Sequence, residues 1–568
     1  MAMKTPGVYI VEKNAFPPSV VEVATAVPAF IGYTEFALNG GNTLKGKPWR
    51  ISSMSEYARY FGGAPTPAFK LEDLTDAAAG AGGDAPDKTA ARGQRTEFDH
   101  KGRKYRLSRA AKKAGGRFFM HQAMTHFFQN GGGACYVVSV GDYTKDAEAG
   151  DEGKDLIGGL APLLKEQEPT MVLTPDAVLL SEPDCILVQQ QVLAHCGGKM
   201  RSRVAILDLW AGELDRKDPI GWSCIDEFRN HIGINHLDFA AAYYPWLHTS
   251  LVPASALDYS LFKDDIANLV KLLKADPGLI AGLSADDPRA TARLAAVDAM
   301  LTNDDTWVQQ LKDAVAKDGN IKDADKDKAR ADIDRRAADP DLRRALLAPS
   351  KDLVQKSVIT SSSLYEHVLK EARELINLTP PSAAMAGLYT MVDNSRGVWK
   401  APANVSVANV VRPAVEISHD DQEDLNVTTQ GKSINAIRSF IGEGALVWGA
   451  RTLDGNSLDW RYISVRRTMI MLEESCRLAA KAMVFEPNVG NTWVTIKSMI
   501  SNFLTGIWKR GGLAGAVPDD AFSVHVGLGE TMTSEDILEG ILRVTVLVAI
   551  SRPAEFIEIT FQQQMQKS

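Results

Sequence analysis

The chain has 568 residues, which at roughly 100 to 200 residues per domain corresponds to about three or four folding units. With 45% apolar and 24% charged residues, its composition is that of a soluble globular protein and excludes collagen-like and wholly disordered chains. A net charge of -8 argues against a protein that coats nucleic acid or an anionic membrane. No apolar run approaches the roughly 20 residues that a membrane-spanning helix needs.

The first predicted element is a β-strand over residues 7–12, whose apolar residues are Val8, Tyr9, Ile10 and Val11. Because Pro6 and Gly7 fall where a secretory signal would carry its apolar core, we expect no signal peptide. Small residues over 77–86 then lead into a basic segment, and we interpret this stretch as a flexible surface insertion. A solvated charged face explains the basic residues better than nucleic-acid contact does; they are Lys101, Arg103, Lys104, Arg106, Arg109, Lys112 and Lys113.

Residues 117–250 alternate between helical and strand-like patterns. A helix ending before three glycines at 131–133 is followed by an apolar strand at 135–140. This alternation of short β-rich runs with helices predicts a mostly parallel sheet with helices on its faces. The further strands are expected at 170–173, 203–209 and 237–244, and the further helices near 156–164, 184–195 and 224–231.

The stretch from 251 to 377 has a different character. Within residues 301–350 there are 11 Asp and 10 Lys or Arg, with Leu and Ala at helical spacing. Balanced charge of this density is typical of exposed helices joined by ion pairs. We therefore expect an inserted, solvent-facing helical subdomain.

From 378 onwards the sequence predicts an α+β domain. A strand over 445–450 precedes helices over 463–485 and 492–508, and two strands follow at 521–526 and 542–550. A short helix between these strands starts at a capping pattern, Thr533 with Asp536. The fold class expected for the whole chain is thus α/β plus α+β.

Two motifs suggest ligands but fit them poorly. The run Gly431-Lys432-Ser433 has Asn426 where a phosphate-binding loop needs glycine, and no apolar strand precedes it. The spaced aspartates that begin at Asp323 resemble a calcium loop, but Lys328 stands where the sharp turn requires glycine. We expect neither nucleotide nor calcium binding, and we interpret the aspartates as a charged helix face.

Catalytic and metal-binding patterns are also weak. The histidine pairs His121/His126 and His231/His236 are five residues apart, so on a helix they do not share a face. Glu473 and Glu474 are adjacent and diverge, and Cys185 could meet His195 and Cys196 only through the tertiary fold. The cysteines form no close pair, which favours reduced thiols over disulfides or zinc; they are Cys135, Cys185, Cys196, Cys224 and Cys476. We assign no catalytic, cofactor or metal residues, and an α/β hydrolase-like enzyme remains an alternative without a nucleophile motif.

The C-terminus repeats the pattern of the N-terminus. Residues 555–561 form a second β-prone run, with Phe556, Ile557, Ile559 and Phe561 as its apolar residues. Unpaired, each terminal strand would be an aggregation edge. Either both belong to sheets of their own domain, or they are lent to neighbouring subunits by strand addition. Prolines in 15–19 and 549–553 make these stretches candidate hinges.

Seven blocks of sequence, in order, resemble the tail sheath family of contractile injection systems. The blocks are 6–12 (PGVYIVE), 380–404 (PPSAAMAGLY and VDNSRGVWKAPAN), 431–438 (GKSINAIR), 447–453 (VWGARTL), 460–467 (WRYISVRR), 485–488 (FEPN) and 552–556 (RPAEF). The match over 393–397 is most similar to the phage-like extracellular injection particles. The resemblance spans 1–62, 117–250 and 378–568, and leaves out insertions at 64–115 and 251–377.

The resemblance implies a structural subunit with no cofactor. Family subunits stack as hexameric rings around an inner tube, contract, and complete small sheets in their neighbours with terminal arms. The implied domains are an arm and strand joining the core (1–35), an outer segment (36–116), an outward-facing α/β middle domain (117–250), a helical insertion (251–377) and a sheath core (378–568).

The implied partners are copies of the chain, an inner tube protein, baseplate and terminator proteins, and sheath paralogues, with no nucleic acid and no membrane insertion. Assembly is expected in the bacterial cytoplasm, for a particle that is released or anchored. Family sheaths present a helix to the tube, and the candidates here are Lys497, Lys509 and Arg510. A paralogue at the baseplate end is the main alternative.

Overall fold

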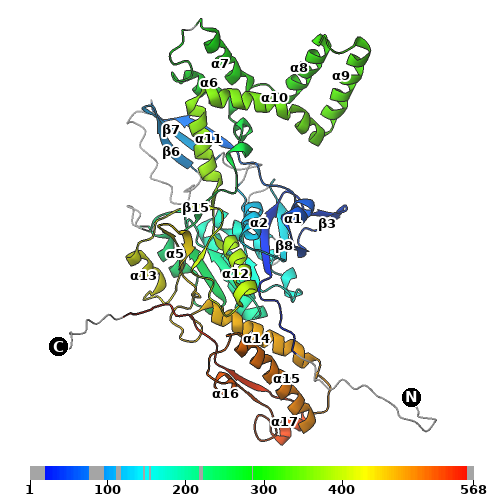
Figure 1. Cartoon of the computed structure of the whole chain (residues 1–568), viewed down its shortest axis with the longest axis vertical. Helices are drawn as coiled ribbons and strands as arrows, with labels where there is room; N and C mark the ends of the chain where they lie inside the picture. The colour runs from blue at the N-terminus through cyan, green and yellow to red at the C-terminus, as the bar shows by residue number, and fades with distance from the viewer. Residues whose placement is uncertain are drawn as a thin grey trace, which may run out of the picture.

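The computed structural model describes residues 20–75, 95–109, 117–144, 147–151, 155–216, 222–284 and 286–559. Three parts follow one another along the long axis (Figure 1). We call them the upper lobe (69–109 with 257–376), the body, which is built around the largest sheet, and the lower lobe (471–550). Each has its own cluster of buried apolar side chains.

The body is organised by a nine-stranded, mostly parallel sheet. Parallel pairings join β8, β1, β9, β10, β11 and β16, and the strands at both edges pair antiparallel. The inner strands are almost wholly buried, as expected of parallel strands covered on both faces. In spatial order the strands are β14 (Val405–Ser406), β17 (Gly444–Val447), β16 (Asn435–Phe440), β11 (Ala240–Tyr244), β10 (Val204–Asp208), β9 (Met171–Leu173), β1 (Pro28–Thr34), β8 (Cys135–Asp142) and β4 (Trp49–Ile51).

This sheet confirms the mostly parallel arrangement and extends it beyond residues 117–250. Its strand β1 comes from the N-terminal 35 residues and lies between β9 and β8. Three further strands, β14, β16 and β17, come from beyond residue 400. The body is therefore assembled from segments far apart in the sequence.

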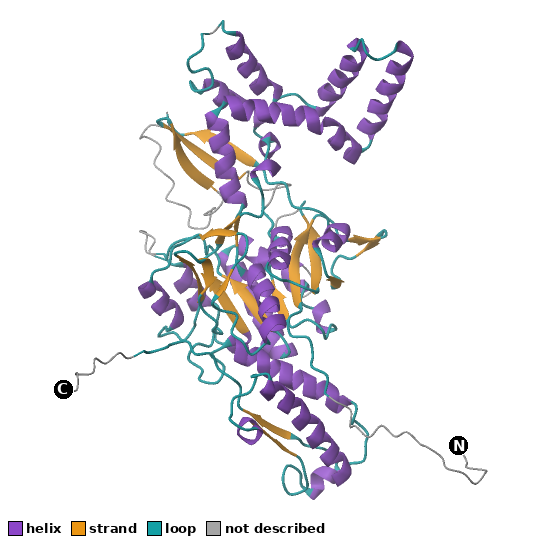
Figure 2. Cartoon of the chain, in the orientation of Figure 1, coloured by secondary structure: helices purple, strands orange, loops and turns teal. Residues whose placement is uncertain are grey.

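Helices pack against this sheet (Figure 2). Both α12 and α4 contact β10, and α12 also packs along α2. A small antiparallel sheet of β12 (Leu247–Thr249), β13 (Leu378–Thr379) and β15 (Val410–Pro413) lies on the body as well. The helices are α1 (Met54–Phe61), α2 (Met120–Gln129), α3 (Asp155–Gly158), α4 (Glu182–Leu193), α5 (Cys224–His231), α12 (Ser382–Arg396) and α13 (His419–Asn426), and β2 (Leu38–Asn39) pairs with β3 (Asn42–Thr43).

The upper lobe joins the two expected insertions into one unit. The strands of its three-stranded sheet come from 69–109, while its helices come from 266–376. Leu71 and Leu107 of the sheet share one buried cluster with Leu269 and Val368 of the helices. The elements are β5 (Phe69–Asp73), β6 (Arg95–His100), β7 (Arg103–Arg109), α6 (Ile266–Ala275), α7 (Pro288–Ala299), α8 (Asp304–Lys317), α9 (Asp323–Ala338), α10 (Pro340–Ser361) and α11 (Ser363–Ile376).

The interpretation of the basic segment as a flexible insertion is wrong for residues 95–109, which form the β6–β7 hairpin. Basic and apolar residues alternate along β7, so Tyr105 and Leu107 are buried while Arg106 lies on the other side. Arg106 donates to Glu97 Oε1 at 2.8 Å. The period of two, rather than the charge, was the informative signal. Lys112 and Lys113 lie outside the described residues.

The helices of the upper lobe confirm the expected charged, exposed character. Lys312 of α8 pairs with Asp334 of α9 at 2.9 Å. Within α9, Lys326 pairs with Asp323 at 2.9 Å, so the aspartates of the calcium-like pattern are a charged helix face. The α8–α9 hairpin projects from the rest of the lobe (Figure 1).

The lower lobe consists of two long helices and a two-stranded sheet. Helix α14 starts beside the body and runs into this lobe, where Met471 packs with Ile500 of α15 and Val524 of β18 in one cluster. The expected capping pattern is present, since the Thr533 hydroxyl accepts from Asp536 N at 3.2 Å. The elements are α14 (Ile463–Lys481), α15 (Gly490–Lys509), α16 (Pro518–Ala521), β18 (Phe522–His525), α17 (Ser534–Leu538) and β19 (Thr545–Val548). Among the described residues, no helix combines the length and apolarity required to cross a bilayer.

Candidate functional site: the roots of the two terminal arms

The C-terminal arm leaves the molecule with its apolar residues exposed. Phe556, Ile557 and Ile559 have exposed fractions of 74%, 79% and 69%. In the described part of the chain they belong to no strand, although their sequence is β-prone. Phe561 and the N-terminal candidates Val8, Tyr9, Ile10 and Val11 lie outside the described residues.

The arm is fixed at Glu555, directly before these exposed residues. The guanidinium of Arg451 donates from Nη2 to Glu555 Oε2 at 2.6 Å and from Nε to Oε1 at 2.9 Å. The Tyr462 hydroxyl donates to the same carboxylate at 3.1 Å, and Asn426 Nδ2 donates at 3.2 Å. Such a two-pronged, charge-assisted contact is among the strongest that side chains make. Arg451 is 3% exposed and Glu555 18% exposed, so water screens the pair poorly.

Arg451 is itself held by the large sheet. The side chain of Asn435, on β16, accepts from Arg451 N at 2.7 Å and donates to Arg451 O at 2.8 Å. The same amide donates to Ala242 O of β11 at 3.1 Å. The root of the C-terminal arm is thus connected to the interior of the body through two side chains.

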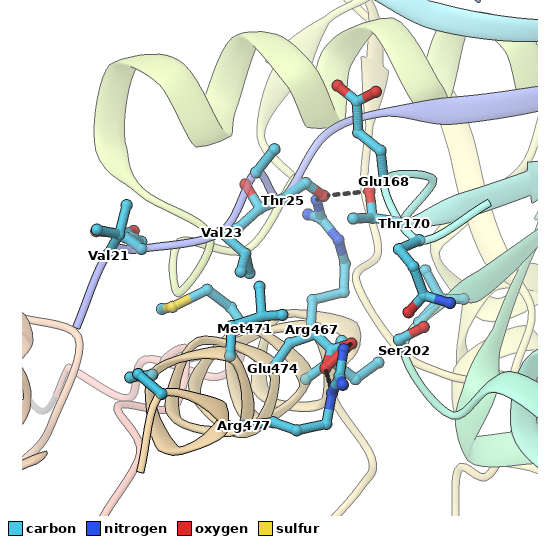
Figure 3. Close-up of a pocket in the computed structure, with 18 of the residues that line it drawn as sticks. Val21, Val23, Thr25, Glu168, Thr170, Ser202, Arg467, Met471, Glu474 and Arg477 are labelled. Carbon is cyan, nitrogen blue, oxygen red and sulfur yellow. Dashed lines mark hydrogen bonds and ion pairs between the residues drawn. The ribbon is translucent and has the colours of Figure 1, made fainter. Parts of the chain in front are cut away.

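The N-terminal segment passes a second buried arginine–carboxylate pair. Arg467 of α14 donates to both oxygens of Asp393, on α12, at 2.6 and 3.0 Å, and both side chains are almost completely buried. The Thr25 hydroxyl donates to Asp393 Oδ2 at 2.6 Å, and Thr25 O accepts from Arg467 at 3.1 Å. Figure 3 shows Arg467 rising from α14 towards Thr25. The N-terminal root is therefore tied to α12 and α14 together.

A cavity of about 600 Å³ lies beside this root. Its walls come from the N-terminal segment, from α14 and α15, and from the chain leading into β9 and β10 (Figure 3). Val23, Met471 and Met499 are among its mainly apolar lining residues. Body and lower lobe are separated here, so α14 and the N-terminal segment bridge the gap.

The lower lobe presents an incompletely paired sheet. In the described residues β18 and β19 pair only with each other, and the isolated bridge of Leu513 with Ile550 extends the pairing slightly. A two-stranded sheet is marginal by itself and has unpaired backbone groups along its outer edges. These edges are of the kind that accept an added strand.

The three tube-facing candidates lie on or just after α15, in different settings. Lys497 and Lys509 are exposed. Arg510, the C-cap residue, forms an ion pair with Glu22 and lies over the Trp399 ring, 5.2 Å from its centroid. Lys497 and Lys509 are therefore more available to a partner than Arg510.

The phosphate-loop-like run is an internal structural element. Lys432 is buried, its ammonium donates to Arg229 O, and burial lowers its pKa. The Ser433 hydroxyl donates to Asn426 O at 2.6 Å, and β16 begins two residues later. The run thus leads into a core strand.

The other candidate groups have structural surroundings. All five cysteines are free, and burial raises the thiol pKa of Cys476 to about 11. Burial lowers the pKa of His126 to about 4, and its Nε2 lies 3.0 Å from Ala408 O. His231 Nδ1 lies 3.6 Å from Glu182 and 3.4 Å from Glu227, close enough for the three side chains to share an ion, but exposed groups of this kind commonly gather without one.

The residues that hold the arms were missed at the level of sequence, although the quoted blocks contain them. Arg451, Arg467, Asp393 and Glu555 are charged residues with apolar residues close by in these blocks. A charge in such a setting is usually paired when buried. This pattern predicts that each buried charged residue has a partner, but it does not identify the partner.

Comparison with known proteins gives a consistent set of matches. Residues 456–564 match the phage tail sheath C-terminal domain. The tail sheath protein of Burkholderia phage BcepMu is 32% identical over 130 residues, which is 22% of this chain and 27% of that protein. The tail sheath protein of Enterobacteria phage T4 is 26% identical over 137 residues, 24% of this chain and 20% of that protein. The matches thus span about a quarter of these relatives.

Similarity to solved structures extends over the whole chain. The sheath of PVC, an extracellular contractile injection system, in its contracted state has a TM-score of 0.54 at 24% identity, covering 100% of this chain and 99% of that one. The contracted helical sheath of the anti-feeding prophage has a TM-score of 0.54 at 24% identity, covering 99% and 100%. At this identity the likeness concerns the fold.

These relatives and neighbours are sheath proteins, which are structural, so the hydrolase alternative is set aside. The matched C-terminal domain contains Tyr462, Arg467 and Glu555, three of the residues that hold the arm roots. The chain is thus similar to tail sheath proteins in the sequence of its C-terminal domain, and its full length is similar in fold to the sheaths of contractile injection systems.

Proposed function

We propose that this chain is the structural subunit of a contractile sheath. It polymerises as stacked hexameric rings around an inner tube, and the sheath contracts to drive the tube through a target membrane. The subunit has an extended and a contracted packing that differ in free energy, and a barrier traps the extended one. This difference in free energy drives contraction, so no nucleotide is consumed.

The observation that carries the proposal is that the arm lacks a partner strand while the sheet of the lower lobe has open edges. The arm exposes Phe556, Ile557 and Ile559 as a β-prone run without a partner strand, while β18 and β19 form a sheet with open edges. A strand donated by a neighbouring copy satisfies both at once, because it buries the apolar residues and pairs the free backbone groups. The N-terminal run at 7–12 is proposed to do the same in another neighbour.

Further partners follow from the same assignment. We propose that the lower lobe faces the inner tube, with Lys497 and Lys509 on α15 towards it, while the remainder faces outwards. The ends of the sheath bind baseplate and terminator proteins. Assembly takes place in the bacterial cytoplasm, in a particle resembling the extracellular systems of the structural neighbours.

The test is whether the purified chain polymerises. We expect negative-stain micrographs to show tubes or rings at high protein concentration, with a lower concentration limit below which the chain is monomeric. A particle of one chain mass at all concentrations, with both termini intact by mass spectrometry, would contradict the proposal.

A second candidate is a sheath paralogue restricted to the baseplate end. It is favoured by similarity to a chain in the six-fold symmetrised baseplate of the anti-feeding prophage, with a TM-score of 0.53 at 24% identity. Gold-labelled antibody against this chain distinguishes the two, because a sheath subunit is labelled along the whole particle and a baseplate paralogue at one end.

A further inference from the structure

We propose that residues 450–467 act as a coupling segment that fixes the roots of both arms to one rigid element. Tension on a donated strand then passes from one arm to the other through this segment rather than through the remaining fold. This inference rests on the proposed function, since it concerns what strand donation requires of the donor.

The coupling segment is closed by its own backbone hydrogen bonds. Ile463 N donates to Ala450 O at 3.0 Å, and Thr452 N donates to Arg461 O at 2.8 Å. Arg451 and Tyr462 face each other in an antiparallel bridge. The two residues that hold Glu555 most directly from this segment are therefore neighbours across one small closed structure.

The segment continues without a break into α14. Tyr462 is the N-cap residue of this helix, and Arg467 lies in its first turns. The Arg467 guanidinium lies 4.6 Å from the centroid of the Tyr389 ring, which adds a contact with α12. The C-terminal root at Glu555 and the N-terminal root at Thr25 are thus held by the two ends of one hydrogen-bonded element.

The boundary between held and free chain falls at Glu555. Before it, Ser551 N donates to Gly512 O at 3.2 Å and Arg552 donates to Leu458 O at 2.8 Å. After it, every described residue of the arm is exposed. The stretch 549–553, a candidate hinge by its proline, is thus held by hydrogen bonds, and the held part of the arm ends at Glu555.

A fixed root matters because strand donation has an entropic cost. An arm whose root is fixed loses less conformational entropy when a neighbour binds its strand, so pre-organisation favours assembly. Under tension, a carboxylate held by several donors together resists detachment better than a single contact does. Glu555 and Thr25 are accordingly positioning residues for the donated strands.

The root geometry can be measured without assembly. Spin labels on Ile557→Cys and Leu458→Cys, both exposed, report the root by pulsed EPR distance distributions in monomeric protein with Cys476→Ser. We expect a narrow distribution in this background and with Glu558→Gln, a carboxylate on the exposed arm. Glu555→Gln should broaden it. Equal widths for Glu555→Gln and Glu558→Gln would overturn the proposal.

The consequence for assembly is measured separately. Loss of a charge-assisted contact corresponds to roughly a tenfold change in equilibrium, so we expect Glu555→Gln to raise the minimum concentration for tubes about tenfold. Thr25→Val, which keeps the shape but loses the Asp393 contact, should raise it in the same direction, while Glu558→Gln leaves it unchanged. The melting temperature of the monomer should be unchanged for Glu558→Gln and lower for Glu555→Gln and Thr25→Val, because these two leave a buried charged side chain with fewer partners.

The experiments distinguish a failure of the coupling proposal from a failure of strand donation itself. If Glu555→Gln broadens the distances but tubes form at the normal concentration, coupling is refuted although the root contact exists. If the unmodified chain and Glu558→Gln form no tubes at all, strand donation itself fails, and with it the coupling function, while the distance measurement still decides whether Glu555 fixes the root.

Discussion

Several buried charged side chains join segments that are distant in the sequence. Asp176 accepts from the backbone of Tyr33 on β1 and of Phe119 at the start of α2, and burial raises its pKa to about 6. Asp208, at the end of β10, accepts from Ser382 N at 2.8 Å at the start of α12. In both, a carboxylate meets the N–H groups that a helix start leaves unpaired.

Two effects on the pKa of Asp208 oppose each other. Burial raises this pKa to about 7, while the hydrogen bonds from Ser382 act to lower it. A carboxyl group whose pKa is raised in the folded state binds more protons folded than unfolded. Its contribution to stability is thus full below its ordinary pKa near 3.8 and is lost as pH rises through about 7. The slope within this window is at most about 1.4 kcal/mol per pH unit.

We therefore expect Asp208→Asn, which keeps an acceptor for Ser382 N, to flatten the fall in unfolding free energy between pH 4 and pH 7 and to raise the melting temperature at about pH 8. Urea unfolding across this pH range measures it. Asp327→Asn on the exposed face of α9 is the control and should leave the slope unchanged. Parallel pH profiles for Asp208→Asn and the unmodified chain would show that the Asp208 carboxyl titrates normally.

At the scale of elements, the two arms are expected to serve the neighbours more than their own chain. Removal of residues 1–12 or 555–568 should abolish tubes while circular dichroism shows that the body remains folded. The described arm residues after Glu555 are exposed and stabilise the monomer little, whereas loss of Glu555 itself leaves the buried Arg451 without this partner and should lower the melting temperature of the chain that lacks 555–568. Tubes of normal length from either truncated chain would refute strand donation between neighbouring subunits.

Helix α15 is expected to make an electrostatic contact with the inner tube. Reversal of Lys509 and Arg510 to Glu should give sheaths that assemble already contracted or without a tube. Each exposed ion pair contributes only about 0 to 1 kcal/mol, but every subunit repeats it. Electron microscopy of sheaths assembled with the tube protein measures the outcome.

The setting of Arg510 calls for a sharper version of this experiment. Because Arg510 pairs with Glu22, its reversal also disturbs the N-terminal segment. Lys497→Glu with Lys509→Glu changes only exposed side chains of α15 and should have the same effect, and Arg510→Glu alone is the matched comparison. Extended, full-length sheaths from the lysine pair, at ordinary yield and salt sensitivity, would exclude α15 as the contact.

At the scale of the molecule, the upper lobe is a unit with its own core that connects to the body through closely spaced ends. Thr249 N donates to Asn377 O at 2.8 Å, where the helical insertion leaves and returns. For the other insertion, Tyr143 donates to Gly63 O at 3.0 Å and stacks on Phe118 with ring centroids 5.0 Å apart. Short linkers can therefore replace both insertions.

We expect a chain lacking both 64–116 and 251–376 to remain soluble and to form tubes, since the arms and the lower lobe are intact. Deletion of either insertion alone should cause aggregation, because it uncovers the apolar side chains that the other half buries, such as Leu71 and Leu107 or Leu269 and Val368. Size-exclusion chromatography of the three chains measures this. A soluble, monomeric single deletion would show that the halves fold independently.

The sequence by itself determined the local elements. Apolar runs such as 135–140 and 203–209 became buried strands β8 and β10, the charged stretch after 301 became exposed helices, and Thr533 with Asp536 capped α17. The β-prone apolar run at the C-terminus was also evident, although its exposure was not. These features depend on side-chain period and on neighbours a few residues apart, which a sequence displays directly.

Only the tertiary structure decided which elements meet. The position of β1 inside the sheet, the shared core of the insertions at 64–115 and 251–377, and the contacts of Glu555 with Arg451 and of Thr25 with Asp393 all join distant segments. Periodicity indicates that a residue is buried but not what it is buried against, because many apolar or charged partners fit one pattern locally. The choice among them is made by the packing of the whole chain.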